Sequence, residues 1–165
     1  MYLDTLTINM FIGSGLSWEL HFQHSPSRRL CIKEKSNILF VCVGNAGRSQ
    51  MAEAFAKKYG LSASSAGTVP SPRVNPIVVQ AMKEKGIDIS SNNPKMLTTN
   101  MIENASLVVT MGCSVEEVCP KPMLAQMQKK LVAWHLEDPK GKPLEEVRTI
   151  RDEIERRVRE LSRGS

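Results

Sequence analysis

The sequence has few aromatic residues, and its positive charges are not gathered into runs. Phenylalanine, tryptophan and tyrosine make up 5% of the 165 residues, and the formal net charge is +5. The most arginine-rich stretch, residues 145–163, carries six arginines and six acidic residues, which is typical of a solvated helix face. A nucleic-acid partner is therefore not expected, although the positive balance favours an anionic substrate.

The sequence also has no apolar run long enough to cross a membrane, and residues 1–36 carry no convincing export signal. Their apolar stretches are interrupted by Asn9 and Gly13, and Asp4 stands where a signal peptide would be positively charged. Four cysteines are too few for a secreted disulfide framework. We expect a cytoplasmic protein without a membrane partner, with a disordered or loosely docked extension at 1–36 and one domain at 37–163.

The most informative stretch is an apolar run that ends in a glycine-bearing loop and leads directly into a helical pattern. The run is Ile38–Cys42, and Met51, Phe55 and Tyr59 recur at helical spacing beyond the loop. A strand, a tight loop and a helix predict an anion-binding site, because glycines let N–H groups point inward and the helix adds its unpaired N–H groups and dipole. The candidate oxyanion-binding residues are Val43, Gly44, Asn45, Ala46, Gly47 and Arg48.

Cys42 lies beneath the expected anion and is the candidate nucleophile. The N–H groups that hold an anion also favour an ionised sulfur, to which Ser49 can donate a hydrogen bond. Asn45 can pin the loop through its amide, and the planar fork of Arg48 can hold two oxygens of the anion. A nucleotide-binding Walker loop is excluded by the glycine spacing and the missing lysine. A buried structural cysteine is the simpler alternative, but Cys-x5-Arg-Ser at a strand-to-helix junction favours an enzyme.

Strand-like and helix-like stretches alternate along the rest of the chain. Such alternation implies parallel strands joined by right-handed crossovers. We expect an α/β fold with a doubly wound four-stranded parallel sheet, helices on both faces and the ligand at the carboxyl ends of the strands. The expected strands are residues 37–42, 61–66, 107–110 and 131–134, and the expected helices are 48–60, 76–85, 98–104 and 143–161.

A second candidate group, Glu137-Asp138-Pro139, follows the last expected strand. A carboxylate there reaches the same sheet edge as Cys42, so Asp138 can act as the general acid that protonates the leaving oxygen. Taken alone, these residues favour an ordinary Asp-Pro turn, and it is the Cys42 loop in the same chain that favours the general acid. Glu137 is a weaker candidate than Asp138 for the acid.

A third candidate group, Cys113 and Cys119, begins at the end of the third expected strand. Five residues separate the two cysteines, so within a helix they would not meet, and a bond between them requires the segment to unwind. The residues alone leave three hypotheses open: a redox pair, a zinc site completed by His135, and two incidental cysteines.

The motif VCVGNAGRSQMAEAF resembles the phosphate-binding loop and first helix of the low-molecular-weight tyrosine phosphatase superfamily. It is more similar still to the arsenate reductases that share this fold, and the resemblance spans about residues 37–161. The phosphatases usually carry an aromatic residue beside the aspartate. This chain has Lys140-Gly141-Lys142 there instead, which matches the Asp-Pro-x-Gly-Lys pattern of the reductases. Met-Gly-Cys113 and Cys119-Pro also resemble the reductases.

The resemblance implies an arsenate reductase. Cys42 would attack arsenate, Cys113 would attack the sulfur–arsenic adduct and release arsenite, and Cys119 would then displace Cys42 from Cys113. Thioredoxin or a similar thiol reductant would reduce the final disulfide, and no metal or organic cofactor is required. One alternative is a phosphatase that hydrolyses phosphotyrosine or small phosphate esters through a phosphocysteine at Cys42. Another is a metal- or oxyanion-sensing module built on Cys113, Cys119 and His135.

Some arsenate reductases of this fold also bind potassium, through an Asn, a Glu, a Ser and an Asp. Asn45, Glu53 and Ser65 match the first three positions, whereas Lys95 and Met96 stand where the aspartate would be expected. The resemblance therefore carries over the potassium site only in part.

Overall fold

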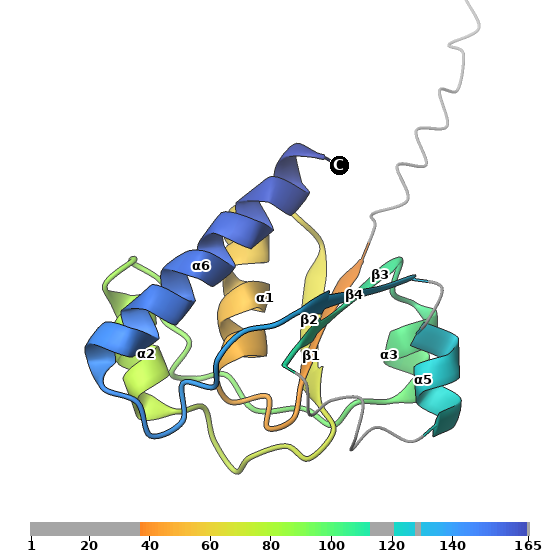
Figure 1. Ribbon diagram of the computed structural model, residues 1–165, viewed down its shortest axis with the longest axis horizontal. Coiled ribbons are helices and arrows are strands. Elements are labelled where there is room, and N and C mark those ends of the chain that lie inside the picture. The colour runs from red at the N-terminus through yellow and green to blue at the C-terminus, as the bar shows by residue number, and fades with distance from the viewer. Residues whose placement is uncertain (1–36, 113–120, 128–129, 165) are drawn as a thin grey trace, which may run out of the picture. The chain divides into compact units, whose positions relative to one another are not determined.

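Within the unit Lys33–Ser165, the computed structural model describes residues 37–112, 121–127 and 130–164. Four parallel strands form one sheet in the order β2-β1-β3-β4, with helices on both faces (Figure 1). The predicted α/β fold with a doubly wound four-stranded parallel sheet is confirmed. The strands are β1 Ile38–Cys42, β2 Ala63–Gly67, β3 Leu107–Met111 and β4 Leu131–Trp134. The helices are α1 Arg48–Lys58, α2 Pro76–Lys83, α3 Thr99–Glu103, α5 Lys121–Met127 and α6 Leu144–Arg163.

Strand β1 lies inside the sheet, and all five of its residues are buried. It pairs with β2 on one side and β3 on the other, and Cys42 stands opposite Gly67. A parallel strand covered on both faces is apolar along its whole length, which explains why ILFVC shows no alternation of polar and apolar residues. This position puts Cys42 in the interior of the carboxyl edge of the sheet.

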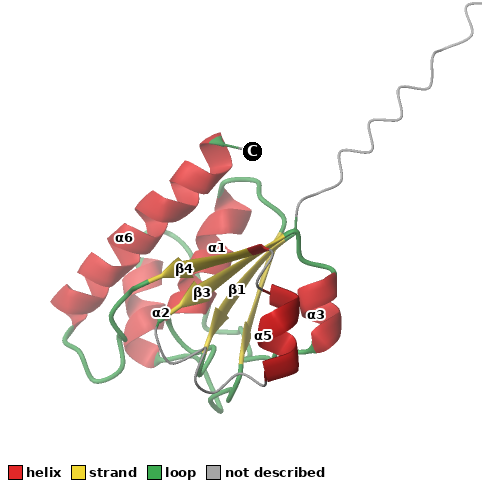
Figure 2. Ribbon diagram, turned by 45° about the vertical axis from the view of Figure 1, so that its right-hand side comes forward, coloured by secondary structure: helices red, strands yellow, loops and turns green. Residues whose placement is uncertain are grey.

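Two apolar cores lie on the two faces of the sheet. Successive side chains of a strand point to opposite faces, so Phe40 packs into one core while Leu39 and Val41 pack into the other. Helices α1, α2 and α6 cover the Phe40 face, and α3 and α5 lie on the opposite face (Figure 2). The first core holds Met51, Phe55, Val78, Met82, Val147, Ile154 and Val158 together with Trp134 of β4.

The helix ends follow local chemistry and agree with the predicted ends to within about two residues. Helix α1 is followed by Gly60 at φ 79°, a left-handed position that glycine adopts without strain. Helix α2 begins at Pro76 after Asn75, whose side chain accepts a hydrogen bond from the N–H of Ile77 at 3.2 Å. Helix α5 was not among the predicted helices.

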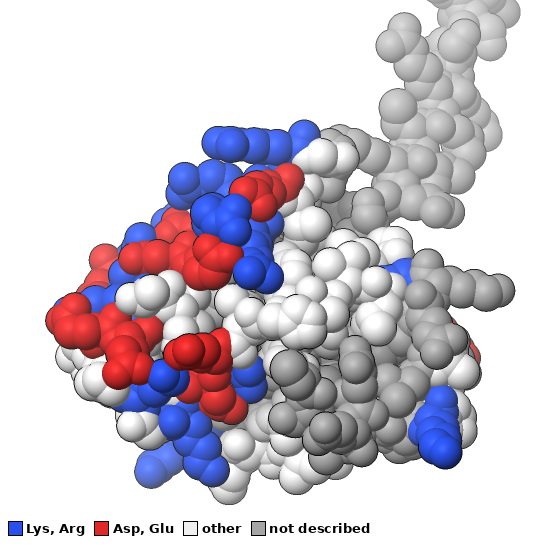
Figure 3. All heavy atoms as spheres, in the orientation of Figure 1, with Lys and Arg blue, Asp and Glu red and all other residues white. Residues whose placement is uncertain are grey.

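The outer face of α6 is covered by interleaved charges of both signs (Figure 3). Arg156, for example, pairs with Glu153 and Glu160 one turn away on either side. The paired charges agree with the prediction of a solvated helix face. None of the described helices is both long enough and apolar enough to cross a bilayer. The predictions for residues 1–36, Cys113 and Cys119 concern positions outside the described part of the chain.

Candidate active site

The loop between β1 and α1 is clamped from outside by the segment that follows β2. The N–H groups of Thr68, Val69, Ser71 and Asn75 donate, in that order, to the carbonyl oxygens of residues 42, 43, 44 and 46, at 2.8 to 3.2 Å. Because the loop's carbonyl groups face outward, its N–H groups are free to face the cavity. Within the described residues, the N–H groups of positions 44, 46 and 47 have no hydrogen-bond partner, as an anion-binding loop requires.

The left-handed residue of this loop is Asn45, at φ 47°, and not one of the glycines. The sequence had suggested that Gly44 and Gly47 provide the conformational freedom, but neither has a positive φ. Both glycines instead allow close approach. A Cβ at position 44 would lie 2.8 Å from Oγ of Ser71, and one at position 47 would lie 2.7 Å from Cγ of Pro139. Asparagine tolerates the left-handed region better than most side chains, so Asn45 can take the strained position.

The side chain of Asn45 is fully buried and makes four hydrogen bonds. Its Nδ2 donates to Oγ of Ser49 at 2.8 Å and to Oγ of Ser65 at 2.9 Å. Its Oδ1 accepts from Nε2 of Gln50 at 3.1 Å and from the N–H of Lys95 at 2.8 Å. The predicted pinning of the loop by this amide is therefore present, and it reaches into β2 and the segment beyond it.

The sulfur of Cys42 lies at the floor of the loop and receives two polar contacts. Oγ of Ser49 lies 2.9 Å from Sγ, and the N–H of Asn45 donates to Sγ at 3.2 Å. Ser49 already accepts a hydrogen bond from Asn45, so its own proton is free to point at the sulfur. Both contacts stabilise negative charge on Sγ, which suits a nucleophile.

Arg48 and Asp138 form an ion pair at the other side of the cavity. Nη2 of Arg48 lies 2.9 Å from Oδ2 of Asp138, and Nη1 donates to the carbonyl oxygen of Leu136 at 2.8 Å. The Arg48 side chain is 10% exposed, whereas that of Asp138 is 59% exposed. The structure thus brings Asp138 to the edge where Cys42 lies, and Arg48 links the α1 loop to the segment after β4.

The backbone just after β3 also lies against Arg48. A Cβ added to Gly112 would lie 2.5 Å from Nη1 of Arg48, so only glycine leaves room for the guanidinium there. Gly112 also has φ 127°, a conformation that other residues rarely adopt. The end of β3 therefore reaches the cavity edge next to Arg48, directly before the segment that begins with Cys113.

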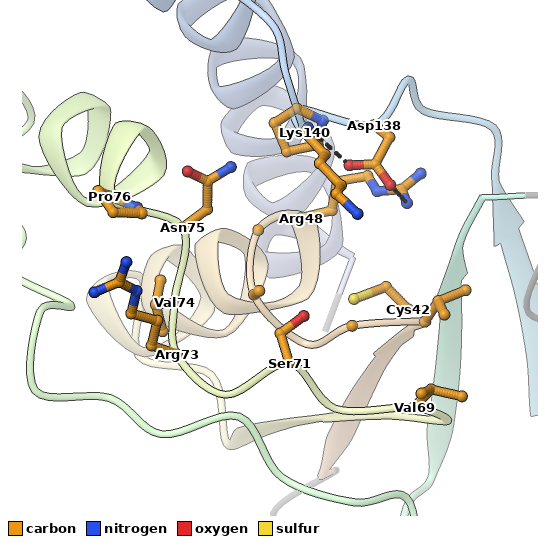
Figure 4. A pocket seen from close by; sticks show the side chains of 15 residues that line it. Cys42, Arg48, Val69, Ser71, Arg73, Val74, Asn75, Pro76, Asp138 and Lys140 are labelled. Carbon is orange, nitrogen blue, oxygen red and sulfur yellow. Dashed lines mark hydrogen bonds and ion pairs between the residues drawn. The ribbon is translucent and has the colours of Figure 1, made fainter.

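A cavity of about 430 Å³ opens above Cys42 and is lined by three segments of the chain. Figure 4 shows Ser71, Arg73 and Asn75 from the segment after β2, with Asp138 and Lys140 on another side. Sequence reasoning missed the segment after β2, although the rule that ligands bind at the carboxyl ends of parallel strands also applied to β2. The lining residues that were missed all belong to this segment and are Val69, Ser71, Arg73, Val74, Asn75 and Pro76.

Two basic side chains, Arg73 and Lys140, stand at the mouth of this cavity. Both are exposed, and within the described ranges neither forms an ion pair. They give the approach to Cys42 a positive charge that favours anions.

The surroundings of Glu137 do not favour it as the acid, and the zinc site suggested for His135 also needs Cys113 and Cys119, which lie outside the described residues. Glu137 lies 2.8 Å from Nζ of Lys142, and that hydrogen bond holds the pKa of its carboxyl below the usual range, so it stays ionised. His135 lines a separate cavity beside α6. Across residues 37–112, 121–127 and 130–164, no cluster of three metal-ligating side chains occurs.

The residues that match a potassium site converge, but they do not fit potassium in this chain. Ser65 joins Asn45 to Glu53, since its Oγ donates to Oε2 of Glu53 at 2.5 Å and accepts from Asn45. Nζ of Lys95 lies 3.4 Å from the same Oε2, so a protein ammonium group already pairs with the carboxylate that a potassium ion would need as a ligand.

The architecture, a parallel α/β sheet with a cysteine beneath an amide-lined loop, suits an enzyme that binds an oxyanion. The sequence profile described as "Low molecular weight phosphotyrosine protein phosphatase" matches residues 37–164, and the chain belongs to this family.

The relatives and similar structures of this chain are named for different reactions. An arsenate reductase of Staphylococcus aureus is 41% identical over 123 residues, which cover 73% of this chain and 91% of that protein. A thioredoxin-dependent arsenate reductase of Corynebacterium glutamicum superposes with a TM-score of 0.59 at 36% identity, covering 78% of this chain and 60% of that one. An arginine phosphatase of Geobacillus stearothermophilus superposes with a TM-score of 0.70 at 26% identity, covering 78% of this chain and 92% of that one.

Proposed function

We propose that this protein is an arsenate reductase in which Cys42 is the nucleophile and Cys113 and Cys119 form the disulfide relay. The observation that carries the proposal is the contact between Gly112 and Arg48. It brings the end of β3 to the cavity that holds Cys42, and Cys113 is the next residue in the chain. The identity to arsenate reductases supports the same assignment.

In the first step, the Cys42 thiolate attacks arsenic(V), and one arsenate oxygen leaves as water. The loop N–H groups and Arg48 hold the remaining oxygens. An anion that engages Arg48 competes with Asp138 for the guanidinium. Asp138 is then free to carry the proton that the leaving oxygen needs.

In the second step, the Cys113 thiolate attacks Sγ of Cys42. The sulfur–sulfur bond forms, the sulfur–arsenic bond breaks, and its electron pair stays on arsenic, which leaves as arsenite. Cys119 then attacks Cys113 and releases Cys42 as a thiolate. The two thiols of thioredoxin reduce the Cys113–Cys119 disulfide, so the cycle belongs in a reducing compartment such as the cytosol.

The test is a single turnover with arsenate and no reductant, followed by mass-spectrometric mapping of the cysteines and measurement of arsenite. The parent is expected to yield arsenite in proportion to protein, together with a Cys113–Cys119 disulfide. Cys31→Ser, a cysteine outside residues 37–163, serves as the matched control and is expected to behave like the parent. The proposal fails if Cys113→Ser turns over arsenate with thioredoxin as well as the parent does.

A phosphatase is the second candidate, and the size of the cavity favours it. About 430 Å³ is room for more than ten waters at roughly 30 Å³ each, far more than one oxyanion fills. The space above the anion can therefore hold the organic group of a phosphate ester. Among the residues that the structure describes, the lining side chains include no aromatic residue, so an aliphatic group fits better there than a stacked ring.

The two candidates separate in one comparison. Hydrolysis of an aryl phosphate needs Cys42, Arg48 and Asp138 but neither Cys113 nor Cys119, because water releases the phosphate from the enzyme. Fast ester hydrolysis by Cys113→Ser/Cys119→Ser, with no arsenate reduction by the parent, would establish the phosphatase instead.

A further inference from the structure

A carboxylate lies beneath the candidate active site without any direct contact to the cavity. Glu53 is on α1, and its side chain is 7% exposed. Two lysines face it: Nζ of Lys57 lies 2.5 Å from Oε1, and Nζ of Lys95 lies 3.4 Å from Oε2. Burial acts to raise the pKa of Glu53, but the hydrogen bonds from Lys57 and Ser65 and the charges of both lysines outweigh it, so the pKa is lowered. Glu53 is therefore ionised and needs a positive partner.

A directed chain of hydrogen bonds connects this carboxylate to the sulfur. Ionised Glu53 can only accept, so Ser65 must donate to it at 2.5 Å. The oxygen of Ser65 is then left to accept from Nδ2 of Asn45, which also donates to Ser49. Ser49 in turn is free to donate to Sγ of Cys42, 2.9 Å away. Ionised Glu53 thus sets the direction of the Ser65 hydroxyl, and Nδ2 of Asn45, which can only donate, leaves Ser49 free to donate to the sulfur.

The two lysines differ in how they contact this series of hydrogen bonds. Lys57 contacts only Oε1, from the next turn of the same helix. Lys95 contacts Oε2, the oxygen that Ser65 uses, and its own N–H donates to Oδ1 of Asn45 at 2.8 Å. Its carbonyl oxygen also accepts from the N–H of Gly67, at the end of β2. Lys95 thus contacts the series of hydrogen bonds at two points, at its Glu53 end and at Asn45 in its middle.

We propose that the Lys95 ammonium is the built-in cation of this loop, so that Lys95 acts as a positioning residue for Cys42 and replaces an inorganic monovalent cation. The partial match to a potassium site is then explained, because the missing acid is exchanged for a lysine that supplies the positive charge itself. The loop is common to reductases and phosphatases, so the proposal is independent of which reaction the protein performs.

The first test needs no variant. The melting temperature of the parent is measured in potassium chloride and in choline chloride at equal ionic strength, and the two values are expected to agree. A parent that potassium stabilises selectively would overturn the proposal, since the site would then bind an inorganic ion.

The second test compares Lys95→Ala with Lys57→Ala as its matched control, since each removes one ammonium from Glu53. In choline chloride, Lys95→Ala is expected to melt about 3 °C below the parent and to recover in potassium chloride, which can occupy the space of the lost ammonium. Lys57→Ala is expected to shift less and to show no selectivity for potassium. Equal shifts in the two variants would overturn the proposal.

The third measurement separates positioning from general stability. The rate at which iodoacetamide alkylates Cys42, followed by mass spectrometry well below the melting temperature, is expected to fall about 5-fold in Lys95→Ala, the worth of one hydrogen bond of about 1 kcal/mol. Potassium is expected to restore it, and Lys95→Arg to keep it near the parent value. An unchanged rate in Lys95→Ala would show that Lys95 only stabilises the fold.

Discussion

The loop that carries Cys42 and the loop that carries Asp138 meet at one cavity, but different contacts hold them. Around Cys42, the side chains of Asn45, Ser49 and Ser65 are fully buried and hydrogen-bonded to one another. Asp138 is mostly exposed and is held by Arg48 and by the N–H of residue 140. The proposed nucleophile thus sits in a buried, hydrogen-bonded frame, while the proposed acid sits on an exposed loop with fewer contacts. This division suits a reaction in which the sulfur must be aligned before attack and the acid must release its arginine when the anion arrives.

The largest expected effect comes from breaking the buried frame. Asn45→Ala leaves polar groups of Ser49, Ser65 and Gln50 without their partner and puts alanine at φ 47°. We expect the free energy of unfolding to fall by about 3 to 5 kcal/mol and kcat/KM by about 100-fold. Urea unfolding and steady-state kinetics measure both. Asn45→Asp, which keeps the shape but loses the donors, should fall between the parent and alanine, and a stability equal to the parent's would contradict the role of the donors.

Removing the acid should affect activity and leave stability intact. Asp138→Asn keeps the shape of the side chain and is expected to slow hydrolysis of an aryl phosphate by about 100- to 1,000-fold. The free energy of unfolding should change by less than about 0.5 kcal/mol, because the Asp138 side chain, which pairs with Arg48, is more than half exposed. A loss of several kcal/mol would mean that the Asp138 loop is part of the rigid frame after all.

A smaller effect is expected from the point where the two loops touch. In Gly47→Ala the new Cβ would lie 2.7 Å from Cγ of Pro139, so the Asp138 loop must shift outward. We expect kcat for ester hydrolysis to fall about 10-fold, as a displaced acid protonates the leaving group less well. In an Asp138→Asn background the same change should cost little, and a full 10-fold loss there would place the damage in the Cys42 loop instead.

The smallest effect is expected at Glu84, which lies outside both loops. Its substitution tests whether the two loops depend on the ion pairs between Glu84 and helix α6. Hydrogen bonds from Arg148 and Arg151 lower the pKa of Glu84 to about 2 from its usual 4.5. A lowered pKa stabilises the fold fully above pH 4.5, and the contribution disappears as the pH falls from 4.5 towards 2. Glu84→Gln should therefore lower the melting temperature by about 1 to 3 °C at pH 7, with the difference from the parent fading below pH 4.5.

Activity at neutral pH should be unchanged in Glu84→Gln. The matched control is Glu103→Gln, an exposed carboxylate without an ion pair among the described residues. A melting difference as large at pH 2.5 as at pH 7 would contradict the role of the ionised carboxylate.

The strand and loop that carry Cys42 could be predicted because their signal is local. A fully apolar strand and a Cys-x5-Arg-Ser loop are contiguous in sequence, and the final helix shows a long apolar stripe. The clamp by residues 68–75 could not be predicted in the same way, since it acts through main-chain groups that any residue possesses. The contact between Lys95 and Glu53 joins positions 42 residues apart and has no sequence period.

The glycines show a second limit of sequence reasoning. A glycine in a loop indicates either a left-handed backbone or a close approach, and only the structure tells the two apart. At position 67, opposite Cys42, a Cβ would lie 2.4 Å from the carbonyl oxygen of Val43, so the need is for space. The left-handed conformation belongs to Asn45, whose buried amide bonds offset its cost.

The main-chain clamp on the Cys42 loop has a practical consequence for redesign. Because residues 68–75 grip the loop through N–H groups alone, the side chains at positions 69, 71 and 73 carry no share of that grip. These three side chains line the cavity and are exposed or half-buried, so they are suitable positions for a mutant library. Substrate preference can be altered there by saturation mutagenesis, provided that proline is left out of positions 69 and 71, where it would delete a clamping donor.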